Sequence, residues 1–161
     1  NSWIDVWKGD DTKQLFVTCR GSVDAADWLI DDVGIATGQG PRDLIGADLK
    51  RIFDKYEKEY DIEVAGHSFG GALVAEGLKS YNLDADRIDF FNPGASPIPW
   101  SKDAVNEFAS DKDAYFFVNA IDPVSLGQLG EKPQHLIMNN PQSWTNPIDN
   151  HSIDQWFKMD Q

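Results

Sequence analysis

The sequence predicts a single α/β domain: a central, mostly parallel β-sheet flanked by helices. Strand-like apolar runs alternate with segments of helical periodicity, an order that is typical of a parallel sheet. The chain has 161 residues, of which 41% are hydrophobic, so it is long enough to bury a sizeable core as one unit. Neither an internal repeat nor a long linker divides it, and we expect one domain over residues 1–161.

The first elements are predicted to be a β-hairpin followed by a helix. Trp3 to Trp7 alternates apolar and polar residues, Gly9 to Asp11 is a turn-like segment, and Leu15 to Cys19 is apolar. From Pro41 to Tyr60 the apolar residues recur at helical spacing, and proline suits the first turn of a helix.

The alternation continues through the rest of the chain. Ile62 to Ala65 is short and rich in β-formers, Gly66 to Gly71 is dense in glycine, and Ala72 to Ser80 is helical in character, which predicts a strand, a sharp turn and a helix. Further strands are expected at Arg87–Phe91, Ala114–Val118 and Leu136–Asn139, and further helices near Lys102–Ser110 and Ser152–Met159.

Composition excludes several classes of partner. The 27 Asp and Glu residues outnumber the 14 Lys and Arg, which gives a formal net charge of -13. A chain so acidic is not expected to bind nucleic acid, and an anionic membrane would repel it. No apolar run reaches the roughly 18 residues of a membrane span, and no basic-then-apolar leader follows Asn1. The single cysteine, Cys19, is expected to be a buried, inert thiol.

The strongest chemical signal is the G-x-S-x-G pattern of Gly66, His67, Ser68, Phe69 and Gly70. Between a strand and a helix, this pattern is typical of a nucleophile elbow, in which a strained serine projects above the sheet. The two flanking glycines give the room that so tight a turn needs, and the start of the helix favours an oxyanion beside the serine. The alternative interpretation is an ordinary glycine-rich turn.

A nucleophilic serine requires a histidine base. Of the three histidines, His67 adjoins the nucleophile and should point away from it, as a packing or hydrogen-bonding residue. His135 directly precedes an apolar run and resembles a strand-edge residue. His151 lies in a loop before the last predicted helix, which fits the chain order serine, acid, histidine of α/β-hydrolase sites, so His151 is the preferred base.

The base in turn needs a carboxylate to orient it. Asp122 follows a buried strand and precedes Pro123, where the chain changes direction, so it is the preferred acid. An Asx-type turn before the proline is the alternative role for Asp122. Two other candidates are Asp149, which better suits a turn, and Asp154, which better suits the first turn of a helix.

The oxyanion hole is expected to combine two loops. The backbone N–H of Phe69 lies next to the nucleophile, and a second donor should come from the loop after an earlier strand, where Arg20, Gly21 and Ser22 lie. We therefore expect Ser22 and Phe69 to hold the oxyanion. Ser22 as a simple turn former is the alternative.

Taken together, these segments resemble the class 3 lipases, which are α/β-hydrolases. The resemblance lies in five segments spread over nearly the whole chain: Cys19–Leu29 with its oxyanion serine, Val64–Leu73 with the nucleophile, Phe90–Gly94, Asn119–Val124 with the acid, and His151–Ser152. It implies an α/β-hydrolase fold and hydrolysis of carboxylic esters by Ser68, Asp122 and His151, without a metal or cofactor. Lipids or small esters are the implied substrates, with transient contact with a lipid interface.

The departures from the family bear on the substrate. The chain begins at the strand Trp3 to Trp7, without the helix that usually precedes it, and the stretch from Asp122 to His151 is short. The family's lid corresponds here to Val23–Asp27, which holds two aspartates and few apolar groups. Short-chain or partly soluble esters are therefore expected over long triacylglycerols. Acyl transfer or thioester cleavage by the same triad, and a lipid-binding module without catalysis, are the alternative functions.

Overall fold

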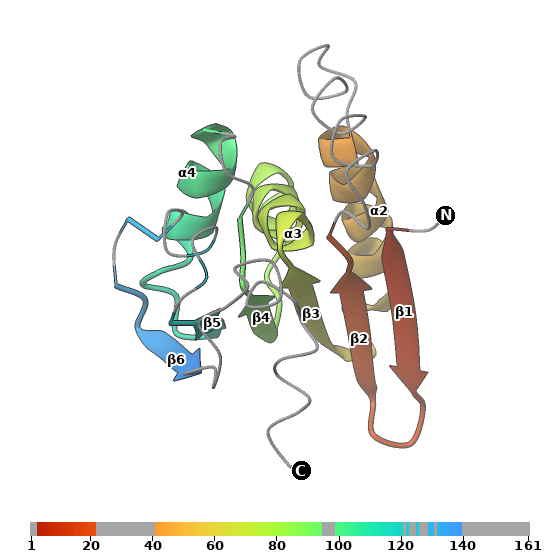
Figure 1. Ribbon diagram of the computed structural model, residues 1–161. Coiled ribbons are helices and arrows are strands. Elements are labelled where there is room, and N and C mark those ends of the chain that lie inside the picture. The colour runs from red at the N-terminus through yellow and green to blue at the C-terminus, as the bar shows by residue number, and fades with distance from the viewer. Residues whose placement is uncertain are drawn as a thin grey trace.

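The computed structural model describes residues 3–21, 41–94, 99–120, 122, 125, 129–130 and 132–139. Within them, six strands form one sheet in the order β1-β2-β3-β4-β5-β6 (Figure 1). β1 (Ile4–Gly9) and β2 (Gln14–Cys19) are antiparallel and form the predicted hairpin. The four strands that follow are all parallel to their neighbours: β3 (Asp61–His67), β4 (Arg87–Phe91), β5 (Ala114–Asn119) and β6 (His135–Asn139). The predicted mostly parallel sheet is confirmed.

Three described helices lie side by side against this sheet: α2 (Pro41–Tyr56), α3 (Phe69–Ser80) and α4 (Pro99–Glu107). α3 is the middle one and contacts both of the others (Figure 1). Alternate strand residues, such as Val64 and Phe90, join helix residues, such as Leu49 and Leu73, in a single buried cluster. Because side chains alternate along a strand, one face of the sheet supplies this core.

The opposite face of the sheet carries aromatic pairs. Phe91 stacks on Phe117 with ring centroids 4.6 Å apart, and Tyr115 stacks on His135 at the same distance. Each pair joins neighbouring strands at matched register. Nearer the edge, Phe16 is exposed beside its cross-strand partner on β1. Such cross-strand pairs stabilise the sheet on this face.

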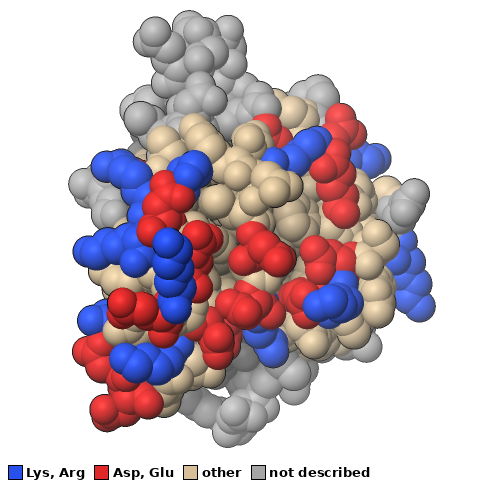
Figure 2. Space-filling model, turned by 180° about the vertical axis from the view of Figure 1, so that it is seen from behind, with Lys and Arg blue, Asp and Glu red and all other residues tan. Residues whose placement is uncertain are grey.

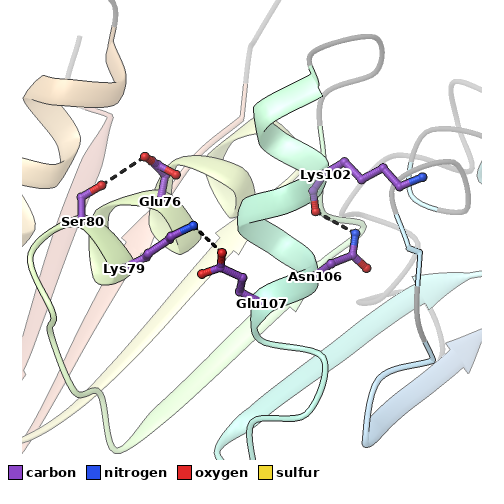
Figure 3. A network of polar contacts seen from close by, with 6 residues as sticks. All are labelled: Glu76, Lys79, Ser80, Lys102, Asn106 and Glu107. Atoms are coloured by element: carbon purple, nitrogen blue, oxygen red, sulfur yellow. Dashed lines mark hydrogen bonds and ion pairs between the residues drawn. The ribbon is translucent and has the colours of Figure 1, made fainter.

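Polar contacts on the outer surfaces connect α3 and α4 (Figure 3). Lys79 on α3 forms an ion pair with Glu107 on α4. Within each helix, Ser80 donates to Glu76 at 3.1 Å, and the side chain of Asn106 donates to the carbonyl of Lys102 at 2.7 Å. An exposed ion pair of this kind stabilises a fold by about 1 kcal/mol at most, so the buried apolar cluster holds the two helices in place.

Most strand boundaries agree with the sequence, but two helices differ from it. α4 spans Pro99–Glu107, whereas a helix near Lys102–Ser110 is predicted, and α2 is shorter than predicted. α2 ends at Tyr56, whereas the periodicity predicts a helix to Tyr60. The N–H groups of Glu59 and Tyr60 both donate to the carbonyl of Tyr56, which tightens the last turn. Tyr60 is buried, and its hydroxyl donates to Asp10 in the hairpin turn at 2.8 Å, so a contact far along the chain ends the helix early. The predicted helix at Ser152–Met159 lies outside the described residues.

Charged side chains of both signs lie on the side of the molecule that Figure 2 shows. There the Lys and Arg side chains lie among Asp and Glu side chains. None of the helices within the described residues is long and apolar enough to cross a bilayer.

Candidate active site

Ser68 occupies the turn between β3 and α3 in a strained backbone conformation. Its φ is 55° and its ψ is -128°, a region that residues with a side chain rarely adopt. Three backbone hydrogen bonds hold it there: its N–H donates to Phe91 at 3.0 Å, and its carbonyl accepts from Gly71 and Gly94, each at 3.0 Å. The structure thus has the sharp strand-to-helix turn that the sequence predicts, with the serine at its apex.

The glycines on either side of Ser68 leave no room for a side chain. A Cβ on Gly66 would lie 2.6 Å from the Cα of Gly71, and a Cβ on Gly70 would lie 2.4 Å from the carbonyl oxygen of Cys19. Both distances are far below contact distance. α3 therefore approaches β3 and the end of β2 so closely only because these positions carry no Cβ, which is the physical reason for the spacing of the motif.

The loop after β2 packs directly against Ser68. A Cβ on Gly21 would lie 2.9 Å from the Cβ of Ser68 and 3.5 Å from its Oγ. β2 and β3 end side by side at the start of α3 (Figure 1), which explains this contact. Ser22, the predicted second oxyanion donor, directly follows Gly21 but lies outside the described residues, as does the predicted lid segment Val23–Asp27.

Phe69 presents its backbone and its ring in different environments. It is the first residue of α3, so its N–H has no acceptor within the helix and lies at the positive end of the helix dipole. Its ring is buried, with centroids 6.4 Å from Trp3 and 6.0 Å from Trp100. The two tryptophans anchor Phe69, which the sequence predicts as an oxyanion donor.

Asp122 is fully buried just beyond the end of β5. Its N–H donates to Asn119 at 3.0 Å, so the chain turns sharply there. Its Oδ2 accepts hydrogen bonds from the hydroxyl of Ser125 and from the N–H of Ser125, the latter at 3.4 Å. The carboxylate thus takes part in a local turn, which is the alternative role that the sequence suggests for it. β5 lies two strands from β3, a distance of about 10 Å between the strand axes.

Between these two strands, a buried asparagine connects the edges of β4 and β5. Asn92 directly follows β4 with φ 42°, and its N–H donates to Phe117 at 2.8 Å. Its Oδ1 accepts the N–H of Asn119 at 2.9 Å. Sequence reasoning did not assign Asn92 or Ser125 a role at the site. A polar residue directly after an apolar strand is the signal that marks Asn92, and the spacing Asp-Pro-x-Ser, typical of a helix N-cap, marks Ser125.

Two of the three histidines can be placed. His67 follows Gly66 on β3, so its side chain lies on the face opposite the helices, where it lines a cavity of about 340 Å³ together with Thr18, Ala65 and Phe91. His135 is the first residue of β6 and stacks on Tyr115. Since β6 is three strands from β3, His135 lies about 14 Å or more from the elbow, too far to hydrogen-bond Ser68. His151, Asp149 and Asp154 lie outside the described residues.

Cys19 lies beside the turn at Ser68, and its thiol is unreactive. It is buried at the end of β2, as predicted, and burial raises the pKa of its thiol to about 12. Within the part of the chain that the structure describes, no group of three or more His, Cys, Asp or Glu side chains could hold a metal ion.

Comparison with known proteins finds a family match over part of the chain. Residues 16–87, which contain β2, the elbow and α3, match the model of the class 3 lipases. Over this segment the chain is similar to the class 3 lipases. No curated protein sequence matches the chain. The match ends before Asp122, so the similarity to the class 3 lipases lies in the turn at Ser68 and in the segments around it.

Two solved lipase structures are similar to the chain at low identity. The Lip2 lipase of Yarrowia lipolytica is 18% identical, with a TM-score of 0.47, over 87% of this chain and 61% of that one. The mono- and diacylglycerol lipase of Aspergillus oryzae is 20% identical, with a TM-score of 0.45, over 86% of this chain and 59% of that one. The chain therefore spans about three fifths of the length of these lipases.

Proposed function

We propose that the chain is a carboxylic ester hydrolase that works through an acyl-enzyme on Ser68. The observation that carries the proposal is the strained serine at the elbow, with the loop of Gly21 packed against its side chain. Strain at a serine between two glycines that cannot carry a Cβ is typical of a nucleophile that must be exposed to substrate. The match of residues 16–87 to the class 3 lipases supports the same reaction.

The base in this proposal is His151. A base must lie within hydrogen-bond reach of the nucleophile, and the chain has three histidines. The sheet places His135 three strands away and directs His67 to the opposite face. His151 is the remaining candidate. Asp122, which follows the end of β5 at the same edge of the sheet as Ser68, is the proposed partner of its imidazole.

The reaction then has two steps. His151 takes the proton of Ser68, whose Oγ attacks the ester carbonyl, and the oxyanion accepts hydrogen bonds from the amides of Phe69 and Ser22. The bond to the alcohol oxygen breaks as His151 returns the proton to it. Water repeats the cycle on the acyl-enzyme, so that the acid leaves and Ser68 regains its proton. Asp122 stabilises the imidazolium throughout and remains ionised.

Labelling with an organophosphonate tests the nucleophile. The parent chain should become covalently labelled and should hydrolyse p-nitrophenyl butyrate. Ser68→Ala should not be labelled, and its kcat should be about 10⁶-fold lower. Ser80→Ala, at the other end of α3, is the matched control and should behave as the parent chain does. Thermal unfolding shows whether both variants remain folded, and Ser80→Ala loses one hydrogen bond, that to Glu76 on the same helix.

Labelling of Ser68→Ala, or its undiminished turnover, would disprove this assignment. A folded parent chain that resists the phosphonate and binds lipid vesicles would instead indicate a lipid-binding module. Products formed in the presence of competing alcohols distinguish hydrolysis from acyl transfer.

The preferred substrate is a short-chain ester. The segment Val23–Asp27 offers one valine and two alanines beside two aspartates, too small an apolar group to dock on an oil surface. For p-nitrophenyl esters of increasing acyl length, kcat/KM should be highest at short chains and show no jump above the solubility limit. Ser68→Ala supplies the background rate. Activity that rises toward long chains and jumps at an interface would contradict this preference.

A further inference from the structure

Ser125 directs two hydrogen-bond donors at a single oxygen of Asp122. Both residues are fully buried, and both the hydroxyl and the N–H of Ser125 donate to Oδ2 of the carboxylate. A buried carboxylate is costly unless donors compensate it, so this contact helps to keep Asp122 ionised in its buried place. None of the steps proposed above uses Ser125.

The contact makes the two oxygens of the carboxylate inequivalent. Because the group is planar, holding Oδ2 fixes the direction of Oδ1, the oxygen to which an imidazole N–H would donate. We propose that Ser125 is a positioning residue, which orients Asp122 so that Oδ1 faces the base of the ester hydrolysis. This inference rests on the proposed function, in which Asp122 orients His151.

Both partners of the contact are themselves fixed by the backbone. The carbonyl of Ser125 accepts the N–H of Leu129 at 3.1 Å, a helical hydrogen bond, and the N–H of Asp122 donates to Asn119. Asn119 is in turn tied to Asn92 at the end of β4. Hydrogen bonds through Asn119 and Asn92 therefore connect the backbone of Asp122 to β4, the strand beside the turn at Ser68. The hydrogen bonds from Ser125 then set the rotation of the carboxylate.

A purely structural role makes a different prediction. If Asp122 served only to cap the helical turn, the N–H of Ser125 would suffice, because a capping carboxylate binds backbone donors. The hydroxyl is the donor that a cap does not need. Ser125→Ala removes this hydroxyl and keeps the N–H, so it separates positioning from capping.

The experiment measures kcat and KM for p-nitrophenyl butyrate. For Ser125→Ala, kcat should fall about tenfold to a hundredfold, as loss of one hydrogen bond to a charged group gives, while KM stays within about twofold of the parent value. Ser125→Thr keeps a hydroxyl and should recover most of the loss. Ser101→Ala, which removes a fully buried hydroxyl from α4, is the matched control and should leave kcat unchanged.

Thermal unfolding shows which variants are folded. Should Ser125→Ala not fold, the comparison passes to Ser125→Thr and Ser125→Cys, whose thiol is the weaker donor and should give the lower kcat. Unchanged kcat in folded Ser125→Ala, equal kcat in the Thr and Cys variants, or an equal loss in Ser101→Ala would overturn the positioning role alone. A parent chain that neither hydrolyses esters nor reacts with the phosphonate would overturn the proposed function and this inference with it.

Discussion

Replacing Gly70 by alanine is expected to unfold the protein or to lower its free energy of unfolding by about 3 kcal/mol or more. The new Cβ would lie 2.4 Å from the carbonyl oxygen of Cys19 and 2.5 Å from that of Arg20. Both atoms belong to the backbone of the β2 edge, so no side-chain rotation relieves the clash. The usual effect has the opposite sign, since alanine stabilises a helix interior relative to glycine by about 1 kcal/mol.

Gly130→Ala is the matched control for this substitution. Gly130 is exposed, and its new Cβ would lie no closer than 3.5 Å to any neighbour, which is ordinary contact. Its free energy of unfolding should stay within about 0.5 kcal/mol of the parent value. Denaturant titration of both variants measures the difference. A Gly70→Ala variant as stable as Gly130→Ala would show that β2 and α3 do not pack as closely as described.

The sequence predicts the elbow well because local constraints and tertiary constraints coincide there. Gly66 and Gly70 are required by contacts with Gly71 and with the end of β2, so the demands of the packed structure are visible as a motif. The strands are predicted equally well, since alternating burial leaves a period that the chain displays directly. β4, for example, has the predicted bounds Arg87–Phe91.

Contacts between distant segments are harder to predict. The end of α2 depends on the hydroxyl of Tyr60 reaching Asp10, fifty residues earlier in the chain. The bridge from Asn92 to Asn119 depends on β4 and β5 being neighbours. Neither contact can be predicted from the composition or from the spacing of residues along the chain. Asp122 is a further example of what the sequence leaves open. The sequence offers a turn role and a site role as alternatives, whereas the buried carboxylate accepts the hydrogen bonds of a turn and also lies at the edge of the sheet where Ser68 lies.

The second large effect, on kcat, is expected when the proposed base, His151, is replaced. His151→Ala is expected to lower kcat for p-nitrophenyl butyrate by about 10⁴-fold or more, because the nucleophile then has no group to take its proton. His135→Ala is the matched control, since it removes the other histidine that the sequence offers as a base. It loses the stacking on Tyr115 and should lower the free energy of unfolding by about 1 kcal/mol, with kcat unchanged.

The contrast between these two variants tests the sheet geometry as well as the chemistry. His135 lies at the amino end of β6, while Ser68 lies beyond the carboxyl end of β3, so strand order and strand direction both separate them. If His135→Ala lost turnover and His151→Ala kept it, the order of β3 to β6 would be wrong and the proposed triad with it. If both variants kept full turnover, a base other than histidine would have to activate Ser68. If only His151→Ala loses turnover, residue 151 must come close to Ser68 at the edge of the sheet where β3 and β5 end. Neither His67 nor His135, the histidines on the described strands, could then be the base.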